Sequence, residues 1–246
     1  MPNLSDKGIY LPPSPIRKLV PFAEAAKRRG IKVYHLNIGQ PDIRTPQVAV
    51  DAVKNIHDQV FEYGHSAGNE SYRRKLADYY RGVGIDVTTD DMVITVGGSE
   101  AIFMAMTICL NPGDEVLVPT LTFIAAVNPV RYAGAEPIFI GCDDSLCIRP
   151  ALVEEYLAQN AEMRGGKCFN KRTGAHIKAM VVVHVFGNMA DMPALMDIAR
   201  RYRLALIEDA TEALGTRYTS GPYSGRMAGT IGDVGVYSFN GNKIIT

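Results

Sequence analysis

The sequence predicts an α/β fold in which helices cover both faces of a mostly parallel β-sheet. From residue 91 onward, short apolar runs alternate with segments of helical character. This alternation is typical of parallel strands buried on both faces, and right-handed crossovers would make the fold a three-layer α/β/α sandwich. Glycine and polar residues follow several of the runs. Ligands of an open parallel sheet bind beyond the carboxyl ends of its strands, so these residues form the candidate site.

Six apolar runs are predicted strands because each is short and bounded by turn or capping residues. They are MVITV (92–96), EVLVP (115–119), EPIFI (136–140), IKAMVVVHV (177–185), LALIED (204–209) and DVGVYSF (233–239). The segments between them predict helices over 97–110, 122–134, 150–163 and 189–203. The sequence KRTG (171–174), between two short alternating runs, predicts a hairpin inserted before the strand at 177–185.

The first ninety residues predict three helices. One covers 15–29 and stops at Gly30, and two more cover 46–57 and 69–82. Two prolines and a glycine in GQPDIRTP (39–46) indicate a loop with a fixed path.

Composition excludes several classes of protein. The 26 basic and 26 acidic residues cancel, which argues against a nucleic-acid or membrane-surface binder that depends on bulk charge. No run approaches the roughly 18 apolar residues of a transmembrane helix. The four cysteines lack zinc-ligand spacing, so we expect no metal site, and reduced thiols in a cytoplasmic protein.

The residues after the first predicted strand suggest an anion site. Gly97, Gly98, Ser99 and Glu100 open a helix there. Glycine permits close backbone approach, and the free N–H groups of a helix start bind anions, so a phosphate fits. A helix start capped by the Ser99 side chain, without a ligand, explains the same residues. Neither GxGxxG nor GxxxxGKS/T is present, so dinucleotide and P-loop sites lose their main support.

Three other strand ends carry candidate residues. Phe123 would cover a planar ring, although simple core packing explains it as well. Asp209 ends a buried strand, where a carboxylate needs a cation such as a protonated ring nitrogen, or caps the next turn. Lys243 lies in a tight loop five positions after Ser238, which would be a second phosphate ligand. If the lysine is desolvated its amine becomes a nucleophile, and otherwise it is an ordinary surface lysine.

Together these residues form the set that pyridoxal 5'-phosphate requires. Such a site contains an anion cradle, a covering aromatic ring, a carboxylate and a lysine, here each after a different strand. The lysine holds the aldehyde as a Schiff base, and the carboxylate keeps the pyridine nitrogen protonated.

Longer stretches carry a family resemblance. Residues 1 to about 118 contain LNIGQPDIRTP (36–46), YGHSAGNESYRRKLADYY (63–80) and VITVGGSEAI (93–102). This part resembles class I amino-acid aminotransferases. Residues from about 113 contain GDEVLVPTLTFIAAVNPVRYAGAEPIFI (113–140), VVHVFGNMADM (182–192), IEDATEALGTRY (207–218) and GTIGDVGVYSFNGNKII (229–245). This part resembles the DegT-like sugar aminotransferases, especially those acting on nucleotide-linked amino-deoxy sugars. Both groups belong to the fold-type I pyridoxal-phosphate enzymes, and we hypothesise a hybrid chain joined near residue 113.

The resemblance implies cofactor-binding roles for particular residues. Lys243 would be the Schiff-base lysine and the acid/base of the proton shift, Asp209 would pair with the ring nitrogen, and Phe123 would stack on the ring. Glu212 stands where many sugar aminotransferases have a glutamine beside the ring hydroxyl. The matched phosphate-binding positions are Gly98, Ser99, Glu100 and Ser238.

The resemblance also implies substrate-side residues and a partner. His184 and Asn188 lie near the site in the DegT-like family. In the class I pattern, Gly39 approaches the substrate carboxylate. Tyr63 reaches the phosphate of a neighbouring subunit, so a homodimer is expected.

The same resemblance predicts the domain organisation. Residues 1–45 would form an N-terminal arm with part of the small domain, and 46–246 a large cofactor-binding domain. Family members continue well past the lysine, so we expect a fold that is incomplete at the C-terminus. It would lack an antiparallel strand and the C-terminal small domain. The runs at 92–96 and 233–239 would then face each other across a gap, and stability would be low.

The function expected from the resemblance is amino transfer, by family analogy from glutamate, to a keto-sugar nucleotide in glycan-precursor biosynthesis. The partners would then be an amino donor and a keto acceptor. Three alternatives remain open. The chain would be a class I amino-acid aminotransferase, an inactive truncated or hybrid chain that at most binds cofactor, or an α/β module for another phosphate ligand.

Overall fold

The computed structural model describes residues 3–244 except positions 13, 15, 16, 38 and 40. The chain divides into two compact units, residues 1–44 and 45–246. The first unit contains α1 (Asp6–Ile9), the 3-10 turn η1 (Arg17–Leu19) and α2 (Val20–Arg28). The helical segment ends before Gly30, as predicted, and Gly30 has a φ of 79°. The first residues of the predicted 15–29 helix lie outside the described residues.

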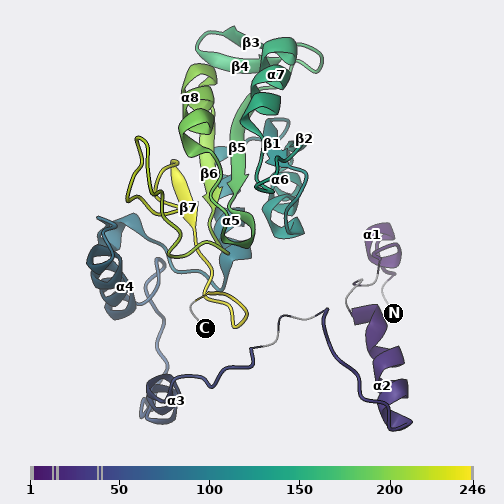
Figure 1. Ribbon diagram of the computed structural model, residues 1–246, viewed down its shortest axis with the longest axis vertical. Helices are drawn as coiled ribbons and strands as arrows, with labels where there is room; N and C mark the ends of the chain where they lie inside the picture. Colours follow the sequence, from purple (N-terminus) through teal and green to yellow (C-terminus); the bar gives the residue numbers. More distant parts are fainter. Residues whose placement is uncertain (1–2, 13, 15–16, 38, 40, 245–246) are drawn as a thin grey trace. The chain divides into compact units, whose positions relative to one another are not determined.

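The second unit is built on a five-stranded sheet in the order β2-β1-β5-β6-β7 (Figure 1). All of its neighbouring strands are parallel. The strands are β1 (Glu115–Pro119), β2 (Glu136–Ile140), β5 (Ile177–Val183), β6 (Ala205–Asp209) and β7 (Val234–Val236). Five of the six predicted strands are therefore confirmed, two of them at both boundaries.

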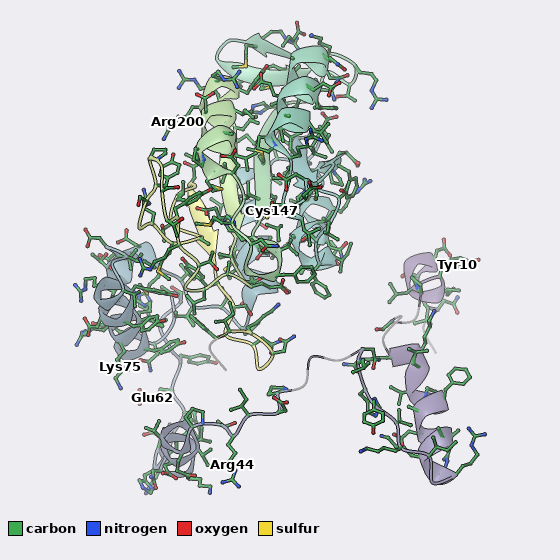
Figure 2. The ribbon with its side chains drawn as sticks, viewed as in Figure 1. Tyr10, Arg44, Glu62, Lys75, Cys147 and Arg200 are labelled. Carbon is green, nitrogen blue, oxygen red and sulfur yellow. The ribbon has the colours of Figure 1, made fainter. Side chains whose placement is uncertain are left out.

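Helices pack against this sheet in pairs. Helix α5 (Gly98–Cys109) contacts α6 (Asn128–Tyr132), and α7 (Pro150–Asn160) contacts α8 (Met192–Tyr202). Both α5 and α8 also contact β6. The side chains between these layers form one apolar core, in which Cys147 is fully buried (Figure 2). The α/β fold class predicted from the sequence is confirmed.

Two predicted helices have different boundaries. The 122–134 segment breaks into the 3-10 turn η3 (Ile124–Ala126) and α6, because Pro129 has no N–H to continue a longer helix. The 150–163 segment ends at Asn160, where β3 (Ala161–Arg164) begins and pairs with β4 (Lys167–Asn170).

The predicted hairpin therefore has two turns instead of one. Gly165 and Gly166 join β3 to β4, and both have positive φ values, as a two-residue hairpin turn of type I′ requires. The predicted KRTG turn also forms, because Phe169 bridges antiparallel to His176 on its two sides.

The predicted strand at 92–96 is wrong. Among the described residues this segment has no strand partner, and Ile94 N–H donates instead to the Ala67 carbonyl at 3.0 Å. Sheet pairing ends at β7, whose described partner is β6 alone. Residues 92–97 and 232–239 line one cavity of about 1840 Å³. Apolar character identified the segment, but a strand needs a neighbour at hydrogen-bonding distance, and the described residues supply none.

The remaining elements precede or connect these strands. They are α3 (Gln47–Lys54), α4 (Glu70–Gly82), the 3-10 turn η2 (Thr89–Asp91) and the 3-10 turn η4 (Val185–Gly187). Helix α4 starts at its Asn69 cap, whose side chain accepts from Ser71 N–H at 2.9 Å. None of the described helices is both long and apolar enough to span a bilayer.

Candidate active site

The large cavity gathers the ends of strands that are far apart in the sequence. It lies beyond the carboxyl ends of β1, β6 and β7 and beside the first turn of α5. Eight of the twelve residues proposed from the sequence line it. They are Gly98, Ser99, Glu100, Phe123, Asp209, Glu212, Ser238 and Lys243.

The first turn of α5 offers unpaired backbone donors. Gly97 is the N-cap, and no described residue accepts from the N–H groups of Gly98 or Ser99. The Ser99 side chain does not cap the helix, so the ligand-free explanation of this turn loses its support. Glu100 uses its carboxylate locally, because Oε2 accepts from Val96 N–H at 2.7 Å. The turn is therefore fixed in place with two N–H groups left for an anion.

Gly98 allows this turn to approach two other parts of the site. A Cβ built on it would lie 2.9 Å from Thr211 Cγ2 and 3.3 Å from Ser238 Cβ. Ser238 is buried, and among the described residues its Oγ accepts one bond, a long one from Asn240 N–H at 3.4 Å. The hydroxyl proton of Ser238 thus remains for an anion held at the start of α5.

Asp209 is a buried carboxylate with little internal compensation. It is 6% exposed, and its Oδ1 accepts from Thr211 N–H at 3.1 Å. Burial raises the pKa of Asp209 above its usual range, and the Thr211 hydrogen bonds and the Lys243 charge oppose this only partly. A cationic group that bound in the cavity would relieve the burial of this charge.

Lys243 forms an ion pair within the site. Its Nζ lies 3.0 Å from Glu212 Oε1, and 20% of its side chain is exposed. The other oxygen of Glu212 accepts from Phe186 N–H at 2.9 Å. Burial would raise the pKa of Glu212, but the Phe186 N–H and Lys243 together outweigh it and lower this pKa. Lys243 is therefore a half-buried amine at the cavity and not a solvated surface lysine.

Phe123 is not a core residue, which was its simplest explanation from the sequence. Its side chain is 72% exposed and lines the cavity. An aromatic ring held open to a cavity can cover a planar ligand.

The His184 side chain does not line the cavity, although its neighbours Val183 and Val185 do, and it lies in the interior of the protein. It is fully buried, and its Nδ1 accepts from Ala190 N–H at 3.2 Å. The proton of the neutral ring is therefore on Nε2, which lies 2.9 Å from Glu208 Oε2 and donates to it. Both ring nitrogens are used within the fold, so we no longer expect His184 to contact a substrate directly.

Three further candidates do not line the cavity. Asn188 donates from Nδ2 to the Ser145 carbonyl at 2.9 Å. Tyr63 is fully exposed, and its expected contact with a neighbouring subunit stays a prediction. Gly39 belongs to the first unit, between two positions outside the described residues, and its role also stays a prediction.

Three further residues at or beside the site were not predicted from the sequence. Glu208 is fully buried and accepts from Gly229 and Ile231 N–H at 2.8 and 2.6 Å, in addition to His184. Thr211 binds Asp209, and Phe186 lines the cavity with a left-handed backbone. Two adjacent acids ending an apolar strand were a visible signal for Glu208, whereas no local pattern marked the backbone of Phe186.

The chemistry of the cavity fits a ligand with an anionic group at one end and a cationic centre near the other. Backbone N–H groups and the Ser238 hydroxyl suit the anion, and Asp209 suits the cation. Lys243 provides an amine beside them. An anion site, a buried carboxylate and an amine are the groups that a pyridoxal-phosphate site requires.

Comparison with known proteins identifies the family. The chain is 32% identical over 205 residues to the GDP-perosamine synthase of Caulobacter vibrioides, covering 82% of this chain and 50% of the relative. It is 35% identical over 147 residues to the UDP-N-acetyl-3-dehydro-alpha-D-glucosamine 3-aminotransferase of Acidithiobacillus ferrooxidans, covering 59% of this chain and 34% of the relative. The chain thus spans half or less of the length of these curated relatives.

The fold has a counterpart among solved structures. A double mutant of Thermus thermophilus aspartate aminotransferase matches with a TM-score of 0.66 and 26% identity, covering 86% of this chain and 54% of that chain. This confirms the fold-type I expectation.

The family model of the DegT/DnrJ/EryC1/StrS aminotransferases matches residues 63–246. The match begins well before residue 113, near which the resemblance to this family was expected to start. The hypothesis of a join near residue 113 stays a prediction. The chain belongs to the DegT/DnrJ/EryC1/StrS aminotransferase family.

Proposed function

We propose that this chain is the cofactor-binding part of a pyridoxal-phosphate-dependent aminotransferase that aminates a nucleotide-linked keto sugar. One observation carries the proposal: the α5 N-terminus, Asp209 and Lys243 converge on one cavity. The names of the two relatives, one a GDP-perosamine synthase and the other a UDP-linked dehydro-sugar 3-aminotransferase, support the substrate class. Glutamate is the proposed amino donor.

The proposed roles follow from the geometry of the chain's own groups. The N–H groups of Gly98 and Ser99 and the Ser238 hydroxyl bind the phosphate, and the Phe123 ring covers the cofactor ring. Asp209 accepts a hydrogen bond from the protonated ring nitrogen, which stabilises its own buried charge. When bound, the cofactor supplies an aldehyde for covalent attachment and an electron-withdrawing ring.

Lys243 is the proposed attachment residue and proton carrier. Its Nζ would carry the proton that is exchanged between the reacting carbon of the substrate and the aldehyde carbon of the cofactor. Glu212 holds this amine at 3.0 Å, so the nitrogen stays at the cavity wall and not in bulk solvent. A glutamate is ionised near neutral pH at its ordinary pKa, and the lowered pKa of Glu212 reinforces this charge.

Borohydride reduction followed by peptide mass spectrometry tests the proposal. The protein incubated with pyridoxal phosphate should be yellow, lose its visible band on reduction, and carry the pyridoxyl adduct on the peptide containing Lys243. The Lys243→Ala variant should remain colourless, and Lys178→Ala, which removes a lysine of β5 outside the cavity, should label normally. A folded protein without an adduct on the Lys243 peptide would overturn the proposal.

A class I amino-acid aminotransferase is the second candidate, favoured by the likeness to aspartate aminotransferase. Assays that offer a keto-sugar nucleotide or a 2-oxo acid as acceptor separate the two candidates. Cofactor binding with neither transfer would favour the non-enzyme alternative.

We also propose a homodimer in the cytoplasm. All four cysteines are free thiols, which suits a reducing compartment. In a dimer, the exposed Tyr63 would reach the neighbouring site, as the family resemblance implies.

A further inference from the structure

Phe186 has an unusual backbone for a bulky residue. Its φ and ψ are 56° and 21°, in the left-handed region that side chains with a Cβ disfavour. Two other described non-glycine residues, Leu146 and Arg203, also have positive φ. Arg203 is the C-cap of α8, where this conformation is common. Phe186 ends no regular helix and therefore requires another explanation.

The turn that contains Phe186 is held from one side by the segment after Asp209. Phe186 N–H donates to Glu212 Oε2 at 2.9 Å, and Thr216 Oγ1 donates to the Gly187 carbonyl at 3.0 Å. A Cβ on Gly187 would lie 3.3 Å from the Glu212 carbonyl oxygen, so the two segments are in close contact. The Glu212 carboxylate, which also binds Lys243, therefore holds the backbone of Phe186 in place.

The ring of Phe186 is not used for packing. It is 71% exposed and lines the cavity that contains Lys243 and Phe123. Burial of the ring therefore does not compensate for the disfavoured backbone. A strained residue held by its surroundings at a ligand cavity is a common sign of a functional role.

We propose that Phe186 is a specificity-determining residue whose ring packs against the C–H face of the keto-sugar substrate. The proposal rests on the proposed function and adds the residue that selects the acceptor. The C–H bonds on one face of a pyranose carry slight positive charge and suit the negative face of an aromatic ring. Glutamate offers two carboxylates and no such face, so the ring favours the sugar over the amino donor.

A substitution that preserves the turn separates this role from a structural one. Glycine adopts positive φ freely, so Phe186→Gly keeps the backbone and removes the ring. We expect its thermal midpoint to equal or exceed that of the wild type. Phe186→Tyr retains an aromatic face and serves as the matched control, with binding close to that of the wild type.

Calorimetry on the cofactor-loaded protein measures the expected loss. The probes are GDP-mannose and UDP-N-acetylglucosamine, with GDP and UDP alone as sugar-free references. Phe186→Gly should weaken binding of the better nucleotide sugar about five- to tenfold and leave binding of its nucleotide unchanged. The rate at which glutamate converts the cofactor should also stay within about twofold.

The other possible results of these measurements would contradict the proposal in different ways. Unchanged affinity for the nucleotide sugar, or a lowered thermal midpoint with weaker binding of every ligand, would overturn the assignment to Phe186. An equal loss with the nucleotide alone would place the ring against the nucleotide and overturn the sugar contact. Wild-type protein that binds neither nucleotide sugar, although its Lys243 adduct forms, would overturn the sugar contact at Phe186 and leave the proposed cofactor site standing.

Discussion

Two adjacent carboxylates on β6 have opposite surroundings. Glu208 and Asp209 are both buried, but successive residues of a strand face opposite sides of the sheet. Glu208 accepts from the His184 ring and from the backbone of the loop before β7, including Gly229 and Ile231. Asp209 accepts from Thr211 and faces the cavity.

The pKa shifts of the two groups differ in sign for this reason. Burial would raise the pKa of Glu208, but the His184 and backbone donors outweigh it and lower this pKa. For Asp209 burial prevails, and its pKa is raised. A carboxylate whose donors are all supplied by the fold stabilises the fold. A buried carboxylate that lacks some of its hydrogen-bond donors indicates where a cationic ligand would bind.

The largest expected effect is at Glu208. Glu208→Ala leaves the Nε2–H of His184 and the N–H groups of Gly229 and Ile231 buried without an acceptor. We expect the free energy of unfolding to fall by about 3–5 kcal/mol, as for other broken buried pairs. Equilibrium denaturation of the variant would measure this loss.

A surface carboxylate provides the control for Glu208→Ala. Glu154 pairs with Arg201 on the protein surface, so Glu154→Ala should cost about 1 kcal/mol or less. If the two variants lost similar stability, the network around Glu208 would have no special structural importance.

A smaller effect is expected at the glycine that faces the Asp209 side of the site. Gly98→Ala brings a methyl group to 2.9 Å from Thr211 Cγ2, and we expect a loss of about 1–3 kcal/mol from overpacking. Gly97 is the matched control because nothing lies within 4 Å of its built Cβ and its φ of 166° is extended. Gly97→Ala should cost less than about 1 kcal/mol by the same denaturation measurement. Equal losses would contradict close packing at Gly98.

The difference between Glu208 and Asp209 also illustrates which features of the site could be predicted from the sequence. That Asp209 and Lys243 line one cavity could be predicted because each lies at or after the end of an apolar run that forms a strand, and a parallel sheet brings such positions to one edge. The segment at 92–96 has the same apolar signal, yet the outcome depends on a neighbouring strand that local sequence does not describe. The burial of His184 against Glu208 could not be predicted, because a histidine after a strand looks the same in sequence whether it faces a ligand or a buried acid. The strain at Phe186 depends on contacts with residues far along the chain.

The smallest expected change in stability has the opposite sign, at Asp209. Asp209→Asn removes a buried charge whose pKa is raised in the fold, so near neutral pH the cofactor-free protein should be as stable as the wild type or up to about 1 kcal/mol more stable. Cofactor affinity should fall at the same time, because the partner of the ring nitrogen is lost. Denaturation and a spectroscopic cofactor titration measure the two effects separately.

The pH dependence of this difference has a definite sign. A raised pKa means that the folded state binds a proton at Asp209 more tightly than the unfolded state, whose value is near 3.8. Relative to Asp209→Asn, the wild type should therefore gain stability as the pH falls from 7 toward that value. Relative to Glu208→Gln, it should lose stability as the pH falls below about 4.5, because the pKa of Glu208 is lowered in the fold. Two curves that ran in the same direction would show that the two faces of β6 do not differ as described.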